Sequence, residues 1–140
     1  MENLEYIEWK KEYESGIVMV DRQHRILVDL INNLTKVHKQ KNEDEILRTT
    51  IIKLVDYTKF HFGYEEKHMI QNGYVKITGH KKLHKVFINQ IIERLELLKM
   101  GNDDKLSEHI LVFLRNWLIE HILKQDREYA HFYKMKKRYS

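Results

Sequence analysis

The sequence predicts an all-α protein, an antiparallel up-down-up-down four-helix bundle with an irregular N-terminal arm. The chain of 140 residues has no proline and five glycines, so long helices can form with few breaks, whereas a sheet-rich fold needs more turn residues. Apolar residues recur at steps of three and four in four separate stretches. The connections between these stretches are short, which favours antiparallel neighbours.

Composition supports one domain spanning residues 1–140. Hydrophobic residues make up 42% and charged residues 33% of the chain, as in soluble globular proteins. No cysteine is present, which excludes disulfides and thiolate ligands and suits a reducing cytoplasm, where we expect the protein. No long apolar run occurs, so we expect no membrane span. The net charge of +4 is spread among interspersed acids, which indicates solvated helix surfaces rather than a nucleic-acid-binding face.

The elements follow from the apolar pattern. The four predicted helices span residues 21–38, 43–71, 78–100 and from 103 onward. Asp21 precedes the first apolar stripe and is a plausible N-cap. Residues 1–20 are expected to form an irregular arm over the bundle, and residues 127–140 a basic C-terminal tail.

The stretch HKKLH places His80 and His84 four residues apart, on the same side of a helix. They continue the stripe of Phe87 and Ile91, so they face the core. A buried pair of imidazoles without partners loses several kcal/mol of solvation. The pair therefore needs something to bind.

Other polar residues of the core stripes converge on the same end of the bundle. In the predicted topology, seven side chains fall within one slab ~10–15 Å thick. They are His24, His61, Glu65, His80, His84, His121 and Asp126. A single histidine on an apolar face is more often an ordinary core residue, and one i,i+4 pair can arise by chance. Seven such residues from four helices are much harder to explain in that way.

The remaining four histidines do not join this group. We assign His38, His109 and His131 to the surface, because their positions along the helices or in the tail lie outside the slab. His68 lies ~10 Å along the helix from His61, which excludes direct ligation. It has either a neighbouring role or none.

One spacing conflicts with a regular helix. His121 and Asp126 are five residues apart, which puts them about 140° apart around an α-helix. Either Asp126 is a surface residue, or the helix contains an extra residue there. A π-type widening restores the shared face, and such bulges occur often at functional sites. We favour the bulge and predict that regular α-geometry is interrupted between these two residues.

Imidazole and carboxylate ligands without thiolate suit iron, manganese or zinc. Seven side chains are too many for one ion but fit two. If Glu65 and Asp126 bridge the ions with one solvent-derived oxygen, five histidines shared three and two leave one vacant position. A vacancy in apolar surroundings suits a small neutral ligand.

Four segments together resemble the hemerythrin family, in particular its single-domain bacterial members. They are DRQH ending at His24, HFGYEE from His61 to Glu66, HKKLH, and WLIEHILKQD ending at Asp126. The resemblance implies a non-haem di-iron centre, in which Glu65, Asp126 and an oxo or hydroxo group bridge two irons. His80, His84 and His121 would then hold the saturated iron, and His24 and His61 the open one. It also implies a dioxygen pocket formed by Leu27, Phe62, Trp117, Leu118 and Ile122.

Two residues do not fit this pattern easily. Gly63 stands in mid-helix, where it costs about 0.5–1 kcal/mol relative to alanine, and the sequence offers no reason for it. His68 stands where an apolar residue is expected.

The leading functional hypothesis is reversible dioxygen binding for storage, delivery or sensing, without enzymatic activity. The alternative is an enzyme that uses the same centre to reduce peroxide or nitric oxide. A third possibility is a structural bundle whose metal only holds the helices together. The sequence argues against an acid-base enzyme, because no uncommitted Asp or Glu appears on the core stripes near the vacancy. No protein partner can be inferred.

Overall fold

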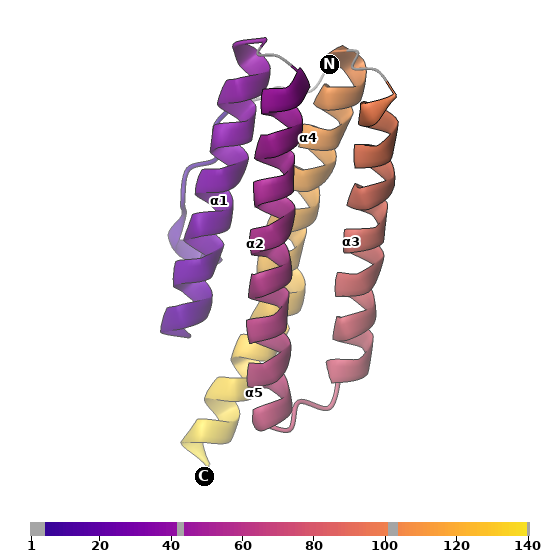
Figure 1. Cartoon of the computed structure of the whole chain (residues 1–140). Helices are drawn as coiled ribbons and strands as arrows, with labels where there is room; N and C mark the ends of the chain where they lie inside the picture. Colours follow the sequence, from indigo (N-terminus) through magenta and orange to yellow (C-terminus); the bar gives the residue numbers. More distant parts are fainter. Residues whose placement is uncertain (1–4, 42–43, 101–103, 140) are drawn as a thin grey trace.

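The computed structural model describes residues 5–41, 44–100 and 104–139, and these form the predicted four-helix bundle (Figure 1). Its helices are α1 (Val18–Lys39), α2 (Asp44–Gln71), α3 (Ile77–Lys99) and α4 (Asp104–Glu120). The π-helix η2 (His121–Gln125) and helix α5 (Asp126–Arg138) continue α4. Helices α1 and α3 each pack against both α2 and α4. The described residues contain no strand, and the all-α prediction is confirmed.

The first helix begins three residues earlier than predicted, and Asp21 is not its N-cap. The residue at the N-cap position of α1 is Ile17, which makes no side-chain cap. The Asp21 carboxylate instead reaches back and accepts hydrogen bonds from the Ser15 amide at 2.8 Å, the Ser15 hydroxyl at 2.7 Å and the Gly16 amide. Gly16 has a φ of +86°, which allows the chain to turn sharply there. Asp21, in the first turn of α1, thus stabilises the turn that precedes the helix and does not cap the helix itself.

The other predicted ends differ by small amounts. Helix α3 begins and ends one residue before its prediction. The predicted starts of the second and fourth helices, at residues 43 and 103, lie outside the described residues.

The N-terminal segment packs against the bundle, and the C-terminal segment is helical. A short 3-10 turn, η1 (Lys11–Tyr13), interrupts the otherwise irregular residues 5–17. The backbone of Ile7 exchanges two hydrogen bonds with the Asn32 side chain of α1, at 2.7 and 2.9 Å. At the other end, α5 runs through most of the expected basic tail, because Tyr129 and Ala130 bury an apolar face. Residues 18–20 belong to α1 and not to the arm.

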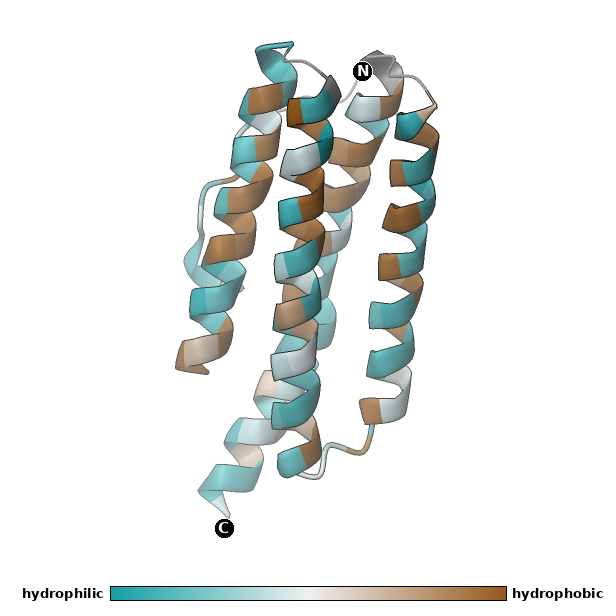
Figure 2. Cartoon of the chain, in the orientation of Figure 1, coloured by the Kyte–Doolittle hydropathy of each residue, from teal (hydrophilic) through white to brown (hydrophobic). Residues whose placement is uncertain are grey.

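Hydrophobic and hydrophilic residues recur in turn along the helices of the bundle (Figure 2), and most of the buried residues are apolar. The buried residues form two clusters. The larger cluster occupies the main bundle, and the smaller one joins the start of α1, the end of α2 and α5. The site lies between them, since α2 contributes Phe62 to the larger cluster and Met69 to the smaller one. No helix in the described ranges is both long and apolar enough to cross a membrane.

Candidate metal centre

The structure brings all seven predicted side chains together. Helix α1 supplies His24, α2 supplies His61 and Glu65, and α3 supplies His80 and His84. His121 opens the π-helix and Asp126 follows it. Each of the seven is at most 4% exposed, so very little of the site is exposed to bulk water. Their donor atoms fall into two groups that share Glu65, and within each group all donor atoms lie within 4.8 Å of one another.

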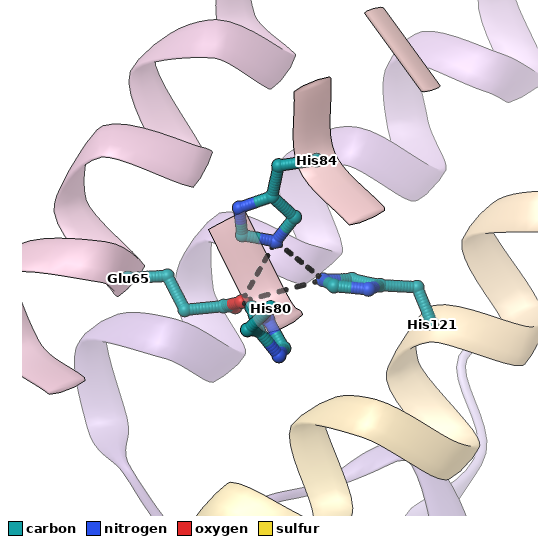
Figure 3. A group of neighbouring side chains, drawn as sticks. All are labelled: Glu65, His80, His84 and His121. Atoms are coloured by element: carbon teal, nitrogen blue, oxygen red, sulfur yellow. Dashed lines mark hydrogen bonds and ion pairs between the residues drawn. The ribbon is translucent and has the colours of Figure 1, made fainter. Parts of the chain in front are cut away.

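The first group joins three histidines to Glu65 (Figure 3). The Nε2 atoms of His80, His84 and His121 lie 2.6, 3.2 and 3.3 Å from Glu65 Oε1. His84 Nε2 and His121 Nε2 are 3.4 Å apart. Neighbouring ligands of an octahedral ion lie ~3 Å apart when its bonds are ~2.1 Å long. The spacing of this group therefore suits a six-coordinate ion.

The second group joins two histidines to both carboxylates. His24 Nε2 lies 2.7 Å from Asp126 Oδ2 and 3.9 Å from Glu65 Oε2. His61 Nε2 lies 3.1 Å from Glu65 Oε2. This group has one histidine fewer than the first.

Each carboxylate presents one oxygen to each group. Glu65 directs Oε1 toward the three histidines and Oε2 toward His24 and His61. Asp126 does the same, with Oδ1 lying 3.0 Å from His121 Nε2 and Oδ2 lying 2.7 Å from His24 Nε2. Two carboxylates placed in this way can each bind two ions at once.

The π-helix η2 is what turns Asp126 toward the site. It covers His121–Gln125, and regular α-geometry resumes at Asp126. The prediction of a departure from α-geometry between these two residues is confirmed. The extra residue offsets the 140° separation of an i,i+5 pair, so both side chains face inward.

Several buried polar atoms at the site lack hydrogen-bond partners. Among the described residues, they include both ring nitrogens of His24, Nε2 of His61, Oε2 of Glu65 and both oxygens of Asp126. Buried polar atoms are nearly always paired, because leaving one unpaired costs about 1–3 kcal/mol. Bound cations would pair with the lone pairs of these oxygen and nitrogen atoms. The residues present therefore suit a pair of metal ions.

Two outer hydrogen bonds orient the rings of this site. His61 Nδ1 donates to Gln23 Oε1 at 2.8 Å, and His84 Nδ1 donates to Glu66 Oε2 at 2.8 Å. Since the outer nitrogen carries the proton, the Nε2 of each neutral ring has a free lone pair. In His61 that lone pair faces a carboxylate oxygen of Glu65, so two acceptors meet unless a cation lies between them.

The histidines of the site also differ in the pKa of their rings. Burial lowers the pKa of His121, but Asp126 and Glu65 outweigh burial and raise it to about 10. Hydrogen bonds with the same carboxylates outweigh burial at His80 and raise its pKa to about 9. At His61 burial dominates and lowers the pKa.

The carboxylates shift in the opposite direction. Burial raises the pKa of Glu65, but the charges of His121 and His61 outweigh burial and hold it well below its usual value. Burial and the negative charge of Glu65 raise the pKa of Asp126, but its contacts with His121 and His24 lower it overall. At neutral pH without metal, two carboxylates thus face two imidazolium rings.

A small cavity lies one helical turn from His24 and His61. Its volume is ≈ 10 Å³, and its lining includes three of the five residues expected around a dioxygen pocket, Leu27, Trp117 and Leu118. The hydroxyl in the lining is that of Thr58, and it donates to its own helix at the Leu54 carbonyl. A cavity of this size is at the lower limit for one water molecule, and its hydroxyl is already engaged.

The other two expected pocket residues are buried close to the histidines. The Phe62 ring stacks on His84 with centroids 3.7 Å apart, and it lies 5.5 Å from the Trp117 ring. Ile122 is buried within the π-helix.

His68 has a hydrogen-bond partner, which favours a neighbouring role for this residue over no role. Its Nδ1 lies 2.5 Å from the hydroxyl oxygen of Tyr129, and that hydroxyl lies 3.1 Å from the His68 carbonyl. Of the histidines assigned to the surface, His109 and His131 are exposed. His38 is half-buried and shares a hydrogen bond with Ser107.

Sequence reasoning missed three residues near the site. Gln23 and Glu66 adjoin predicted ligands along the chain, and this adjacency is the signal that could have identified them. Tyr129 was placed in the tail, although it follows Asp126 by three residues on one helix face.

A helical bundle that gathers five histidines and two carboxylates into two groups defines a protein able to hold two metal ions. Residues 15–133 match the family model of the hemerythrin HHE cation binding domain. The chain is 34% identical over 125 residues to a bacteriohemerythrin of Clostridium acetobutylicum, covering 86% of this chain and 96% of that protein. It belongs to the hemerythrin family.

Further relatives agree with this assignment. A bacteriohemerythrin of Stenotrophomonas maltophilia is 33% identical over 122 residues, covering 87% of this chain and 78% of the relative. A myohemerythrin of Theromyzon tessulatum is 28% identical, covering 87% and 89% of the two chains. The crystal structure of a hemerythrin mutant shares the fold, with a TM-score of 0.78 at 24% identity over 89% of this chain and 94% of that one.

Proposed function

We propose that this protein binds dioxygen reversibly at a non-haem di-iron centre. The observation that carries the proposal is the unequal pair of histidine groups, which share Glu65 and each face one oxygen of Asp126. Three histidines and two carboxylate oxygens nearly complete an octahedral shell, whereas two histidines leave room for a further ligand. Membership of the hemerythrin family supports iron as the metal.

In this proposal, His80, His84 and His121 hold one iron, and His24 and His61 hold the other. Glu65 and Asp126 would each hold both irons, and an oxo or hydroxo group would complete the centre. Two ferrous ions supply the two electrons that dioxygen takes up when it binds.

The chain's own contribution is to make binding reversible. Leu27, Trp117 and Leu118 line a small, mostly apolar cavity one turn from the open position, and Phe62 and Ile122 add to the apolar wall. Irreversible loss of the bound oxygen in a reduced form requires protons from outside. A closed apolar wall without free hydroxyl groups withholds them. The same wall argues for a carrier and against a reductase, which has to admit protons at every turnover.

Metal analysis and an oxygen balance test this function. Protein from iron-supplied cells should contain two irons per chain, and His84→Ala or Glu65→Ala should lose at least one, whereas the exposed control His109→Ala should keep both. The reduced protein should gain a visible charge-transfer band under dioxygen and lose it under inert gas over several cycles. Release of stoichiometric peroxide, or steady oxygen consumption with a reductant, would support the enzyme instead.

A further inference from the structure

A second, larger cavity lies on the outer side of the metal centre, between α2 and α3. Its volume is ≈ 450 Å³, and its lining includes Phe62, Gly63, Ile88 and the ring of His84. Volumes of this order are typical of pockets for small organic molecules. We refer to this cavity as the Gly63 hollow.

The absence of a side chain at Gly63 keeps the hollow open. A Cβ atom built at this position meets no heavy atom within 4 Å, and the backbone there does not have a positive φ. Neither close packing nor backbone geometry therefore requires glycine at this place in the middle of α2, where glycine is less stable than alanine. Space for a ligand is a physical reason for a residue that the sequence alone left unexplained.

The rim of the hollow is positively charged. Lys59, Lys81 and Lys85 all belong to its lining and are all exposed. None of the three makes an ion pair or a side-chain hydrogen bond with another residue in the described parts of the chain. The one acid in the lining is Glu66, whose carboxylate is already engaged by His84 Nδ1 at 2.8 Å. Three lysines against one carboxylate leave a net charge of +2, which favours an anion.

The floor of the hollow is apolar. Phe62 is buried and Ile88 is half-buried, and both belong to the larger hydrophobic cluster. A ligand that covers them would remove apolar surface from water while its charge remains at the rim. The floor and the rim together define an amphipathic ligand of small size.

We propose that the Gly63 hollow binds a small organic anion, a carboxylate or phosphate on a compact apolar body, against the outer edge of His84. The site does not depend on the proposed dioxygen chemistry, since its lining is complete without metal. Because Glu66 joins the hollow to His84, the ligand also changes the surroundings of one histidine of the metal centre.

Nuclear magnetic resonance of the zinc-loaded protein tests the proposal, because zinc is diamagnetic and keeps one oxidation state. The probes are phenyl phosphate, benzoate and inorganic phosphate. We expect saturable shifts of the amide signals of Gly63, Lys81 and Lys85 and of the His84 Nδ1 proton with both organic anions. Phenyl phosphate should bind more tightly than benzoate, because it carries nearly two charges above pH 7. Equal affinity for inorganic phosphate would overturn the role of the apolar floor.

Two matched pairs of variants test the two parts of the site. Gly63→Leu fills the hollow and should weaken phenyl phosphate binding at least ~10-fold, whereas Gly79→Leu, also open at its Cβ, should not. The double variant that combines Lys81→Gln with Lys85→Gln should weaken phenyl phosphate binding about 3- to 10-fold.

The charge-matched control replaces Lys36 and Lys53, which are exposed and outside the hollow, and should leave binding unchanged. Equal weakening in the control pair, or undiminished binding by Gly63→Leu, would overturn the proposal. Failure of the dioxygen function would instead appear only in the iron-loaded protein, so the two results can be separated.

Discussion

Metal uptake should release protons, because two histidines of the centre are protonated in its absence. The pKa values of His80 and His121 lie at about 9 and about 10. At pH 7 nearly all of both rings therefore carry a second proton, and a metal binds only the neutral ring. Loading two divalent ions at pH 7 should thus release ~2 protons per chain from these rings.

The number of released protons should fall as the pH rises. At pH 9.5, His80 retains roughly a quarter of its extra proton and His121 roughly three quarters, so loading releases ~1 proton from the two rings. Ionisation of a bridging water adds to the count at both pH values. The diagnostic quantity is therefore the decrease of ~1 proton between pH 7 and pH 9.5. His61 should contribute little, because burial lowers its pKa.

Isothermal titration calorimetry with Zn²⁺ measures this count when each titration is repeated in buffers of different ionisation enthalpy. His121→Gln lacks one of the two titrating rings and should release at least ~1 proton fewer at pH 7, whether it keeps both ions or loses one. The control His109→Gln changes an exposed ring on α4 and should match the parent protein. An equal count at both pH values, or fewer than one proton at pH 7, would refute the assignment of charge at the site.

Three further predictions concern stability and the pocket. Gly79→Ala should stabilise the protein by ~0.5–1 kcal/mol in thermal unfolding, because its Cβ meets open space, whereas Gly73→Ala, at φ +67°, should destabilise it by ~1 kcal/mol. A lower melting temperature for Gly79→Ala would contradict this. Leu118→Ala should cost ~2–5 kcal/mol and speed the decay of the oxygenated spectrum, because it enlarges the small apolar cavity and makes room for water; an unchanged decay rate would count against the pocket. The raised pKa values of His80 and His121 contribute stability below pH 6.5 that is lost as the pH rises through 9 to 10. The denaturant midpoint of the metal-free protein should therefore fall between pH 7 and pH 10, and a constant midpoint would argue against the ion cluster.

The helices and the seven inward polar side chains could be predicted because both follow from periodicity. A residue such as His84 is placed by counting from Phe87 along one helix face, without knowledge of any contact. The early start of α1 could not be found in this way. Asp21 has the chemistry of an N-cap, and only the folded turn shows that its carboxylate binds the Ser15 amide instead.

Contacts between side chains of different helices could not be predicted from periodicity either. Gln23 and Glu66 reach histidines on neighbouring helices, 38 and 18 residues away in the sequence. Which partner such a side chain finds depends on helix register and rotamer, and neither is encoded in a local pattern. The basic sequence near the C-terminus similarly suggested a solvated tail, although Tyr129 and Ala130 bury one face of α5.

The π-helix lets the centre accommodate one extra residue in the chain. Each residue of an α-helix advances the chain by about 100° and 1.5 Å. In a regular helix Asp126 would lie about 140° around the axis from His121, and the wider turn of the π-helix removes most of that difference. Deleting one residue between them would leave the pair four residues apart, about 40° around a regular helix. The Asp126 carboxylate would then still face the centre, and the Tyr129 face would still reach the smaller cluster. The spacing of this ligand pair in a sequence can therefore differ by one residue while the seven ligands stay together.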